Sequence, residues 1–433
     1  MKVLMFGWEF PPFASGGLGT ACYGLTKGLA KHDIDVTFVL PKVIKETKAE
    51  FVKLKGLDNI KKITVNKNEL QYLKKINFKE VDSLMRPYMT DTEYQEKRKT
   101  IFNNKLETEI IFGESKGGDV YGKNLYDEVY KYALRATEIV KTEDFDVIHA
   151  HDWLTYQAGI NAKRMSGKPL VVHIHATEFD RTGDNPNQYV YDIEKAGFEA
   201  ADKILAVSNF TKQRVIDNYG IDANKIEVVH NAVDFNDNKF EKIQKDEKVV
   251  LFLGRITIQK GPEYFVEAAS KVLSVDPNIK FIVAGSGDMM HQMIEHAAAK
   301  GIGDKMLFAG FLRGKDIDKA YQMADLYVMP SISEPFGITP LEAMRNGTPC
   351  LISKQSGVSE VIQHCLKVNF WDVDQMANKM LAVLKYSDLH SALQKHGNQE
   401  VMKFNWEIPA KKCVDAYHKV VEDYNNIGVG DDD

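Results

Sequence analysis

The sequence contains little cysteine. Four cysteines are spread along its 433 residues, at Cys22, Cys350, Cys365 and Cys413. Disulfide frameworks and zinc knuckles are recognised by closely spaced cysteines, and no two of these share such a spacing. We therefore expect neither a disulfide scaffold nor a structural zinc site, and a reducing compartment fits the chain.

Long apolar runs and a surplus of basic residues are also lacking. No apolar stretch approaches the roughly 20 residues of a membrane-spanning helix. The apolar run near the N-terminus soon meets Glu9, Pro11 and Pro12, which makes it too short for a signal peptide. The formal net charge is -5 with both signs mixed along the chain, whereas nucleic-acid binders carry a basic patch. We therefore expect a cytoplasmic protein with no membrane and no nucleic acid as a partner.

What the sequence does contain is an alternation of short apolar runs with helical periods. Residues 3–6 are continuously apolar, as a strand buried on both faces requires. A glycine-rich loop, a helix over 20–31 and a strand over 36–40 follow, which predicts a parallel β-α-β start. Residues 42–123 are rich in Lys and Glu and weakly periodic, so we expect an insertion there, with an irregular hairpin over 61–73.

The alternation returns after this insertion and restarts at residue 248. The first series continues with a predicted helix over 126–141 and strands over 146–149, 170–173, 203–207 and 225–229. The second series has a helix over 262–275 and strands over 249–253, 281–284, 326–329 and 349–352. Residues 231–247 are polar and predict a linker. A chain of 433 residues with 44% apolar content therefore predicts two α/β domains.

The first candidate motif is Gly16-Gly17-Leu18-Gly19, between a predicted strand and a helix. Glycines allow a ligand to approach the backbone closely, and a helix N-terminus favours an anion. The spacing differs from that of a dinucleotide-binding loop, and the next strand ends without an acid to hold a ribose. A ligand-binding loop and a glycine-rich packing turn both stay open.

Two His-x-His pairs follow predicted strands, at His149 and His151 and at His173 and His175. The carboxyl ends of parallel strands form the edge at which ligands bind, and residues two apart in a strand face the same way. These pairs permit a metal site, although no second carboxylate lies at a fitting distance. Core packing for some of them and a sugar-contacting role for one or two are the other interpretations.

Two cations lie in the first strand-to-helix connection of the second series. Arg255 follows Gly254, and Lys260 precedes Gly261 and the next predicted helix. Cations at such a connection suit a diphosphate, because they stabilise negative charge that builds on a leaving group. Solvated surface cations are the alternative.

The most distinctive motif spans residues 333–344, with the sequence Ser-Glu-Pro-Phe-Gly-Ile-Thr-Pro-Leu-Glu-Ala-Met. Thr339 and Pro340 suit the start of a helix, and Glu342 would complete a capping box. Glu334 lies in the preceding loop, where a carboxylate beside backbone amides is placed to accept hydrogen bonds from sugar hydroxyls.

As an ordered set these motifs resemble retaining glycosyltransferases of the GT-B fold. Glu334 and Glu342 match the family's E-x7-E signature, and the glycine loop, His175 and the two cations occur in the family's order. Segments 149–153 and 8–12 resemble glycogen and starch synthases. Bacterial synthases usually carry lysine in the first glycine loop where this chain has Ala14, so a sucrose- or trehalose-type transferase stays an alternative.

The resemblance implies an α/β fold with GT-B architecture, in which two Rossmann-like doubly wound domains face a central cleft. Residues 1–235 would form the acceptor-side domain, with the insertion at 42–123. Residues 236–405 would form the nucleotide-sugar-binding domain. Residues 406–433 would form a helix that crosses back to the first domain, followed by an acidic tail.

The resemblance also implies a role for each motif. Arg255 and Lys260 would bind the donor diphosphate and stabilise it as it leaves, and Glu334 would hold sugar hydroxyls. His175 would contact the transferred sugar near its reacting carbon, and Asp152 would lie on the acceptor side. The other implied donor-binding positions are Gly16, Gly17, Phe336, Gly337, Ile338, Thr339 and, for the ribose, Glu342.

The implied reaction is the transfer of glucose from ADP- or UDP-glucose to the non-reducing end of an α-1,4-glucan, with retention of anomeric configuration. The nucleotide sugar would be a co-substrate, and we expect no metal and no other cofactor. A metal-dependent hydrolase using the His-x-His pairs, an isomerase of nucleotide sugars with the same fold, and a non-catalytic sugar-binding module stay open as alternatives.

Overall fold

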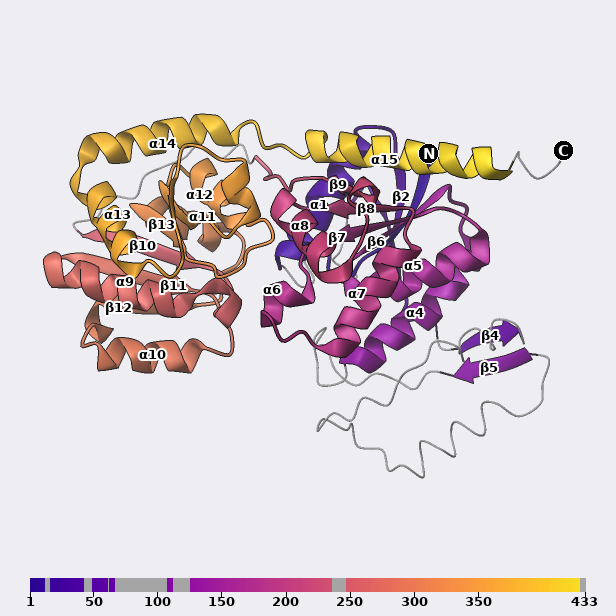
Figure 1. Ribbon diagram of the computed structural model, residues 1–433, viewed down its shortest axis with the longest axis horizontal. Coiled ribbons are helices and arrows are strands. Elements are labelled where there is room, and N and C mark those ends of the chain that lie inside the picture. The colour runs from indigo at the N-terminus through magenta and orange to yellow at the C-terminus, as the bar shows by residue number, and fades with distance from the viewer. Residues whose placement is uncertain are drawn as a thin grey trace, which may run out of the picture. The chain divides into compact units, whose positions relative to one another are not determined.

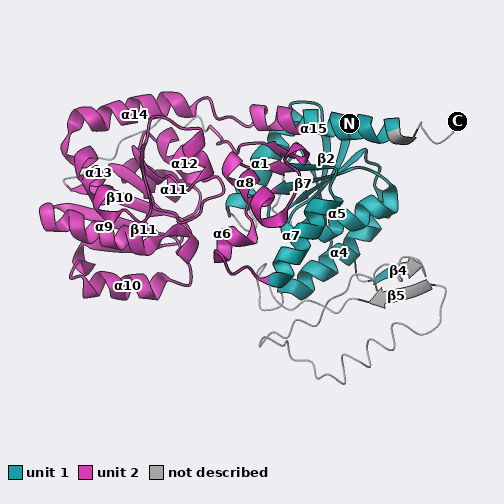
Figure 2. Ribbon diagram, viewed as in Figure 1, with its two compact units in different colours: residues 1–173, 188–204, 414–433 teal, residues 174–187, 205–413 magenta. Residues whose placement is uncertain are grey.

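A computed structural model of the protein describes residues 1–11, 16–42, 49–60, 62–66, 107–111, 125–235 and 247–428. They form two parallel sheets with helices and one antiparallel strand pair (Figure 1). The chain divides into two compact units (Figure 2). Unit 1 comprises residues 1–173, 188–204 and 414–433, and unit 2 comprises residues 174–187 and 205–413.

The first sheet has seven strands in the order β3-β2-β1-β6-β7-β8-β9. β1 pairs in parallel with both β2 and β6, so the strand order reverses at β1. The bounds are β1 Lys2–Phe6, β2 Asp35–Leu40, β3 Lys53–Gly56, β6 Val147–His151, β7 Leu170–Ile174, β8 Lys203–Ala206 and β9 Ile226–Val228. Such a reversal is the feature of a doubly wound sheet that creates a ligand-binding crevice.

The second sheet has six strands in the order β12-β11-β10-β13-β14-β15, and all of its pairs are parallel. Here the order reverses between β10 and β13. The bounds are β10 Lys248–Leu253, β11 Ile279–Ala284, β12 Met306–Gly310, β13 Leu326–Met329, β14 Cys350–Ser353 and β15 Leu366–Val368. The prediction of an α/β chain with two Rossmann-like parallel sheets is therefore confirmed.

The helices pack on the sheets through apolar faces. Unit 1 contains α1 Gly17–Ala30, α4 Leu125–Thr142, α5 Trp153–Ser166, α7 Gln188–Ala200 and most of α15 Glu407–Gly428. Unit 2 contains α6 Glu178–Thr182, α8 Asn209–Tyr219, α9 Pro262–Val275, α10 Met290–Ala299, α11 Lys315–Met323, α12 Thr339–Arg345, α13 Val373–Lys385 and α14 Ser387–Val401. None of the described helices is long and apolar enough to cross a membrane.

The core of unit 2 explains why β10 is a continuous apolar run. Val250 and Phe252 belong to the core cluster that contains the α9 and α13 side chains, whereas Val249 and Leu251 belong to a second cluster with Tyr321 of α11. The strand is thus covered on both faces, as parallel sheets between helix layers require.

The structure corrects two expectations for the segment 42–123. Residues 53–56 form β3, which extends the first sheet beside β2, so this part of the segment is no insertion on the sheet. Strand β4, Lys62–Asn66, pairs antiparallel with β5, Glu107–Ile111, so the pairing joins distant residues rather than closing a hairpin within 61–73. Residues 43–48, 61, 67–106 and 112–123 of that segment, most of the predicted linker and the acidic tail lie outside the described residues. The domain boundaries at 235 and 405 stay predictions.

Gly261 directly follows Lys260, and its backbone conformation and close packing position that residue. Its φ is +62°, and a Cβ atom there would lie 2.2 Å from the carbonyl oxygen of Pro330. Gly301 has a φ of +70° with nothing within 4 Å of a built Cβ. We expect Gly301→Ala to cost about 1 kcal/mol of unfolding free energy through the left-handed backbone alone, and Gly261→Ala to cost clearly more, because the clash adds to the strain. Urea unfolding of both variants measures this, and equal losses would contradict it.

Candidate active site

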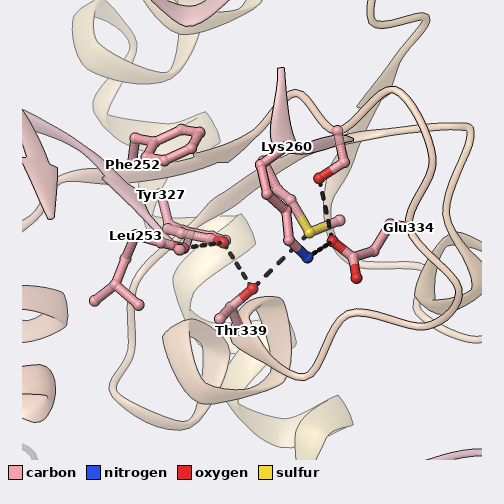
Figure 3. Close-up of a pocket in the computed structure, with 9 residues that line it drawn as sticks. Phe252, Leu253, Lys260, Tyr327, Glu334 and Thr339 are labelled. Carbon is pink, nitrogen blue, oxygen red and sulfur yellow. Dashed lines mark hydrogen bonds and ion pairs between the residues drawn. The ribbon is translucent and has the colours of Figure 1, made fainter. Parts of the chain in front are cut away.

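The candidate site of unit 2 is a small cavity at the carboxyl ends of β10 and β13 (Figure 3). Its volume is about 30 Å³. It is lined by Phe252, Leu253, Gly254, Lys260, Tyr327, Met329, Ser331, Glu334 and Thr339. The reversal of strand order places these residues together, because the connections after β10 and β13 leave the sheet in different directions.

Lys260 and Glu334 form an ion pair inside this cavity. The Lys260 Nζ atom lies 2.5 Å from Glu334 Oε2, and the side chains are only 19% and 9% exposed. Ser331 donates a second hydrogen bond, of 3.2 Å, to the same carboxylate oxygen. The structure thus joins two residues that the sequence placed in separate motifs 74 residues apart. A cation held in a largely dry cavity is suited to an anionic ligand, because its charge is weakly screened there.

Arg255 has a different environment from Lys260. It is exposed, it does not line the cavity, and its guanidinium donates a 3.2 Å hydrogen bond to the Oε1 atom of Gln259. Gln259 is buried and lies in the 3-10 turn Ile258–Lys260 that ends at the cavity. The two cations are therefore carried on one short connection, with Lys260 directed inward and Arg255 at the surface.

The loop 336–339 differs from the prediction at the start of α12. The residue before the helix is Ile338, which makes no capping hydrogen bond, so the predicted capping box of Thr339 and Glu342 is wrong. The Thr339 hydroxyl lies 2.8 Å from the Tyr327 hydroxyl instead, and Glu342 accepts a 3.1 Å bond from Tyr321. Of the predicted residues, Phe336 is buried and Gly337 has a φ of +98°. Pro340 lies in the first turn, as the second residue of α12 and not as its first.

Burial affects the acid–base behaviour of Glu342. Its surroundings raise the pKa of the carboxyl above its ordinary value, chiefly because burial disfavours the charged form, although the Arg345 charge and the Tyr321 hydrogen bond oppose this. Because its carboxylate is not used to cap its own helix, Glu342 keeps acceptor capacity for a ligand hydroxyl.

Asp180 is a site residue that sequence reasoning missed. Its Oδ1 atom accepts a 2.6 Å bond from the Ser333 hydroxyl and lies 3.3 Å from Arg214 Nε, while Oδ2 accepts the backbone and hydroxyl bonds of Thr177. Asp180 lies in the segment 174–187, which also carries His175 and which belongs to unit 2. It therefore joins the His175 segment to the residue beside Glu334. The Thr-x-x-Asp capping box at 177–180 was the available signal.

Asp152, the predicted acceptor-side residue in unit 1, has a backbone conformation that is unusual for a residue with a side chain. Its φ is 58° and its ψ is 168°, and it is 5% exposed at the start of α5. This region of backbone space is essentially restricted to glycine and costs about 1–3 kcal/mol for other residues. Such strain concentrates at functional sites, where the surrounding structure holds it in place.

Gly16 of unit 1 packs closely against the Glu9 carboxylate. The buried Glu9 carboxylate accepts hydrogen bonds from the backbone amides of Gly16 and Gly19, at 3.2 and 3.3 Å, at the N-terminus of α1. A Cβ atom on Gly16 would lie 2.7 Å from Glu9, whereas one on Gly17 would meet nothing within 4 Å. The helix N-terminus therefore holds an internal anion, and donor contact by Gly16 and Gly17 stays a prediction.

Three of the four paired histidines are core residues. His149, His151 and His173 are at most 2% exposed, and one ring nitrogen from each lies within 4.8 Å of the other two. The rings are stacked, with interplanar angles of 8° to 29°, and His149 Nδ1 lies 2.6 Å from the Tyr417 hydroxyl of α15. Lone pairs lie in the ring plane, so those of near-parallel rings run side by side instead of converging on one point. This geometry is typical of packing more than of metal ligation.

Comparison with known proteins agrees with this fold. A family model for Glycosyl transferases group 1 matches residues 234–400, and one for Glycosyltransferase Family 4 matches residues 107–237. An uncharacterized glycosyltransferase of Methanocaldococcus jannaschii is 30% identical, with 98% of this chain and 99% of that protein covered. The D-inositol 3-phosphate glycosyltransferase of Salinispora tropica is 28% identical over 67% of each chain.

Solved structures show the same fold at lower identity. Sucrose-phosphate synthase of Thermosynechococcus elongatus has a TM-score of 0.71 at 18% identity, with 97% of this chain and 98% of that chain covered. Anabaena HepE, in complex with UDP and glucose, has a TM-score of 0.66 at 15% identity, with 97% and 100% covered. The chain has the GT-B fold and belongs to the glycosyltransferases, as the motifs predicted.

Glu342→Gln tests the environment of the buried carboxyl. An acid whose pKa is raised on folding contributes stability below its unfolded pKa and loses it as pH rises through the folded pKa. Glutamine is neutral throughout, so we expect the variant to gain stability relative to the parent protein as pH rises from about 4 to about 7. Urea unfolding at both pH values measures this.

Glu360→Gln is the matched control for Glu342→Gln. Burial raises the pKa of Glu360, but His230 and the backbone amides of Asn209 and Phe210 outweigh this and lower it overall. Its stabilising effect is therefore present above the unfolded pKa, and the variant should lose stability over the same rise in pH. The account of Glu342 is wrong if both variants change in the same direction.

Asp152→Gly tests the strained backbone. Glycine adopts this conformation without strain, so we expect a gain of about 1 kcal/mol in unfolding free energy together with a loss of glycosyl transfer of roughly tenfold or more. Asp152→Asn keeps the strain and should show no such gain. Thermal unfolding and turnover are measured on both variants, and a destabilised or fully active Asp152→Gly protein refutes the assignment.

Proposed function

We propose that this protein is a metal-independent, retaining glycosyltransferase that uses a nucleoside diphosphate sugar, with ADP- or UDP-glucose as donor and an α-1,4-glucan as acceptor. The observation that carries the donor proposal is the buried Lys260–Glu334 pair at the switch point of the second sheet. Lys260 supplies a cation that can bind a phosphate, and Glu334 supplies a carboxylate that can accept hydrogen bonds from sugar hydroxyls. The complex of HepE with UDP and glucose, a protein of the same fold, supports this class of donor.

On donor binding, the diphosphate would replace the Glu334 carboxylate as the partner of Lys260. The diphosphate would approach the Lys260 ammonium and the exposed Arg255 guanidinium, which belong to one connection after β10. Glu334, released from Lys260, would accept hydrogen bonds from the sugar hydroxyls. Its main chain is fixed for this role by hydrogen bonds with Gln355 and Gly357, of 3.0 and 2.9 Å. The ribose hydroxyls would reach Glu342.

The reaction we propose is a front-face displacement. The acceptor oxygen forms a bond to C1 of the sugar on the side from which the phosphate oxygen departs, and the acceptor proton passes to that phosphate oxygen. Positive charge develops on the sugar ring and negative charge on the diphosphate. Lys260 and Arg255 stabilise the negative charge, and a cation positioned before the reaction does so without reorganisation.

The acceptor proposal rests on sequence segments outside the Lys260–Glu334 cavity. Similarity to glycogen and starch synthases rests on the segments 8–12 and 149–153, and Asp152 is the strained residue of the second. The names of the Salinispora and Thermosynechococcus proteins instead point to inositol phosphate and sucrose phosphate chemistry. A small phosphorylated acceptor is therefore the second candidate.

A donor screen tests the proposal. Release of nucleoside diphosphate is measured from ADP-glucose and UDP-glucose, with and without glycogen or inositol phosphate, with EDTA present throughout. We expect acceptor-dependent release in EDTA and a product with the anomeric configuration of the donor by NMR. Release that needs added metal would favour a metal-dependent hydrolase, and turnover without acceptor would favour an isomerase.

Lys260→Ala and Arg255→Ala test the assigned roles. Each should lower turnover about 100- to 1,000-fold, because each removes charge stabilisation from the departing diphosphate. Lys395→Ala, which removes an exposed lysine outside the cavity, is the control and should leave turnover unchanged. Unaltered turnover in Lys260→Ala would contradict the role of the ion pair.

A further inference from the structure

A second cavity of unit 2 is larger than the candidate donor site and lies among different residues. Its volume is about 140 Å³, well above the roughly 10–15 Å³ that one water requires. It is lined by His230, Asn231, Ala232, Lys403, Phe404, Asn405, Ile408, Pro409 and Lys412. Two chain segments, 230–232 and 403–412, thus form its walls, and a hydrogen bond of 3.0 Å from Val233 N to Phe404 O joins them.

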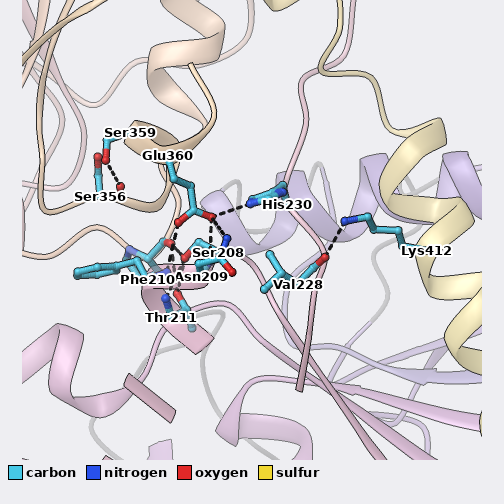
Figure 4. Close-up of polar contacts among 11 residues, drawn as sticks. Ser208, Asn209, Phe210, Thr211, Val228, His230, Ser356, Ser359, Glu360 and Lys412 are labelled. Atoms are coloured by element: carbon cyan, nitrogen blue, oxygen red, sulfur yellow. Dashed lines mark hydrogen bonds and ion pairs between the residues drawn. The ribbon is translucent and has the colours of Figure 1, made fainter. Parts of the chain in front are cut away.

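The charged side chains that line this cavity are lysines. Lys403 and Lys412 line it, and no carboxylate is among its described lining residues. Lys412 is held in place by a 2.9 Å bond to the Val228 carbonyl (Figure 4). Lys403 is exposed, with no described carboxylate within ion-pair distance. α15 begins beside the cavity at Glu407, whose backbone amide is capped by Asn405 Oδ1 at 3.0 Å, so the positive charge at the cavity comes from the lysines.

His230 forms a fixed wall of the cavity. Its Nε2 atom lies 2.6 Å from Glu360 Oε1, and the same carboxylate accepts bonds from the backbone amides of Asn209 and Phe210 at the start of α8 (Figure 4). The Glu360 carboxylate is therefore hydrogen-bonded to His230 and to these two backbone amides.

Asn231 is the observation that points to a ligand. It is 8% exposed and lines the cavity, and its side-chain amide has no hydrogen-bond partner in the part of the chain that the structure describes. Although the residue is largely buried, its amide atoms stay accessible, so they can form hydrogen bonds with a molecule inside the cavity.

We propose that this cavity binds the phosphate group of a small phosphorylated molecule. Two ammonium groups match a dianion, and lysine is a common phosphate ligand. The Asn231 amide would bond to the ester oxygen or to a hydroxyl beside it. The volume of the cavity is below the roughly 300–1,000 Å³ of pockets for drug-sized ligands, which suits a small ester. This site is separate from the proposed donor site and does not depend on it.

Isothermal titration of the full chain tests the site, with inorganic phosphate, glucose 6-phosphate and glucose as probes. We expect both phosphates to bind and glucose not to bind. Lys403→Gln should weaken both phosphates about tenfold, the effect of losing one charge-assisted hydrogen bond. Asn231→Ala should weaken glucose 6-phosphate more than inorganic phosphate, because only the ester offers the additional oxygen.

Two further variants locate the binding. Lys395→Gln makes the same charge change at an exposed position outside the cavity and should leave affinity unchanged. Lys260→Gln removes the lysine of the candidate donor site. It should leave the affinity of the second cavity for the two phosphates unchanged. The proposal is overturned if neither phosphate binds, if Lys403→Gln binds like the parent protein, or if Lys260→Gln abolishes binding. Circular dichroism confirms that each variant is folded.

Discussion

The ion pair between Lys260 and Glu334 is the interaction on which the candidate site depends. It connects the end of the loop after β10 with the loop after β13, and both side chains are largely buried. Removing the partner of a fully buried charge costs about 3–5 kcal/mol, so an anion beside the largely buried Lys260 is strongly favoured. In this structure the anion is Glu334. A diphosphate carries enough charge to take its place, and this exchange would free the carboxylate for the sugar.

The surrounding fold keeps both partners in position. Gly261 turns the chain directly after Lys260 against the Pro330 carbonyl, and Asp180 holds Ser333 beside Glu334. The main chain of Glu334 is further tied to the segment 355–357. These contacts fix the main chain that carries the two residues before any ligand binds, so only their side-chain ends rearrange, and charges held in place by the protein stabilise a transition state most effectively.

Most of the fold could be predicted from apolar periodicity, since buried parallel strands such as β1 and β10 are continuous apolar runs. Strand β3 was missed because its sequence, Lys-Leu-Lys-Gly, belongs to an exposed sheet edge and has only one large apolar side chain. The capping box at Thr339 was wrongly predicted because Tyr327, from another element, takes the threonine hydroxyl. Asp180 and Ser333 are 153 residues apart, so no local pattern reveals their hydrogen bond. The motif residues were found because their types suit phosphate and sugar chemistry, whereas their pairing required the fold.

The most direct test of the central claim is a crystal structure of the protein with a bound nucleoside diphosphate, UDP or ADP. The account predicts that the Lys260 ammonium leaves Glu334 and lies within hydrogen-bond distance of a phosphate oxygen, with the Glu334 carboxylate turned to the space that the sugar would occupy. A diphosphate bound elsewhere, with the 2.5 Å contact between Lys260 and Glu334 unchanged, would contradict it.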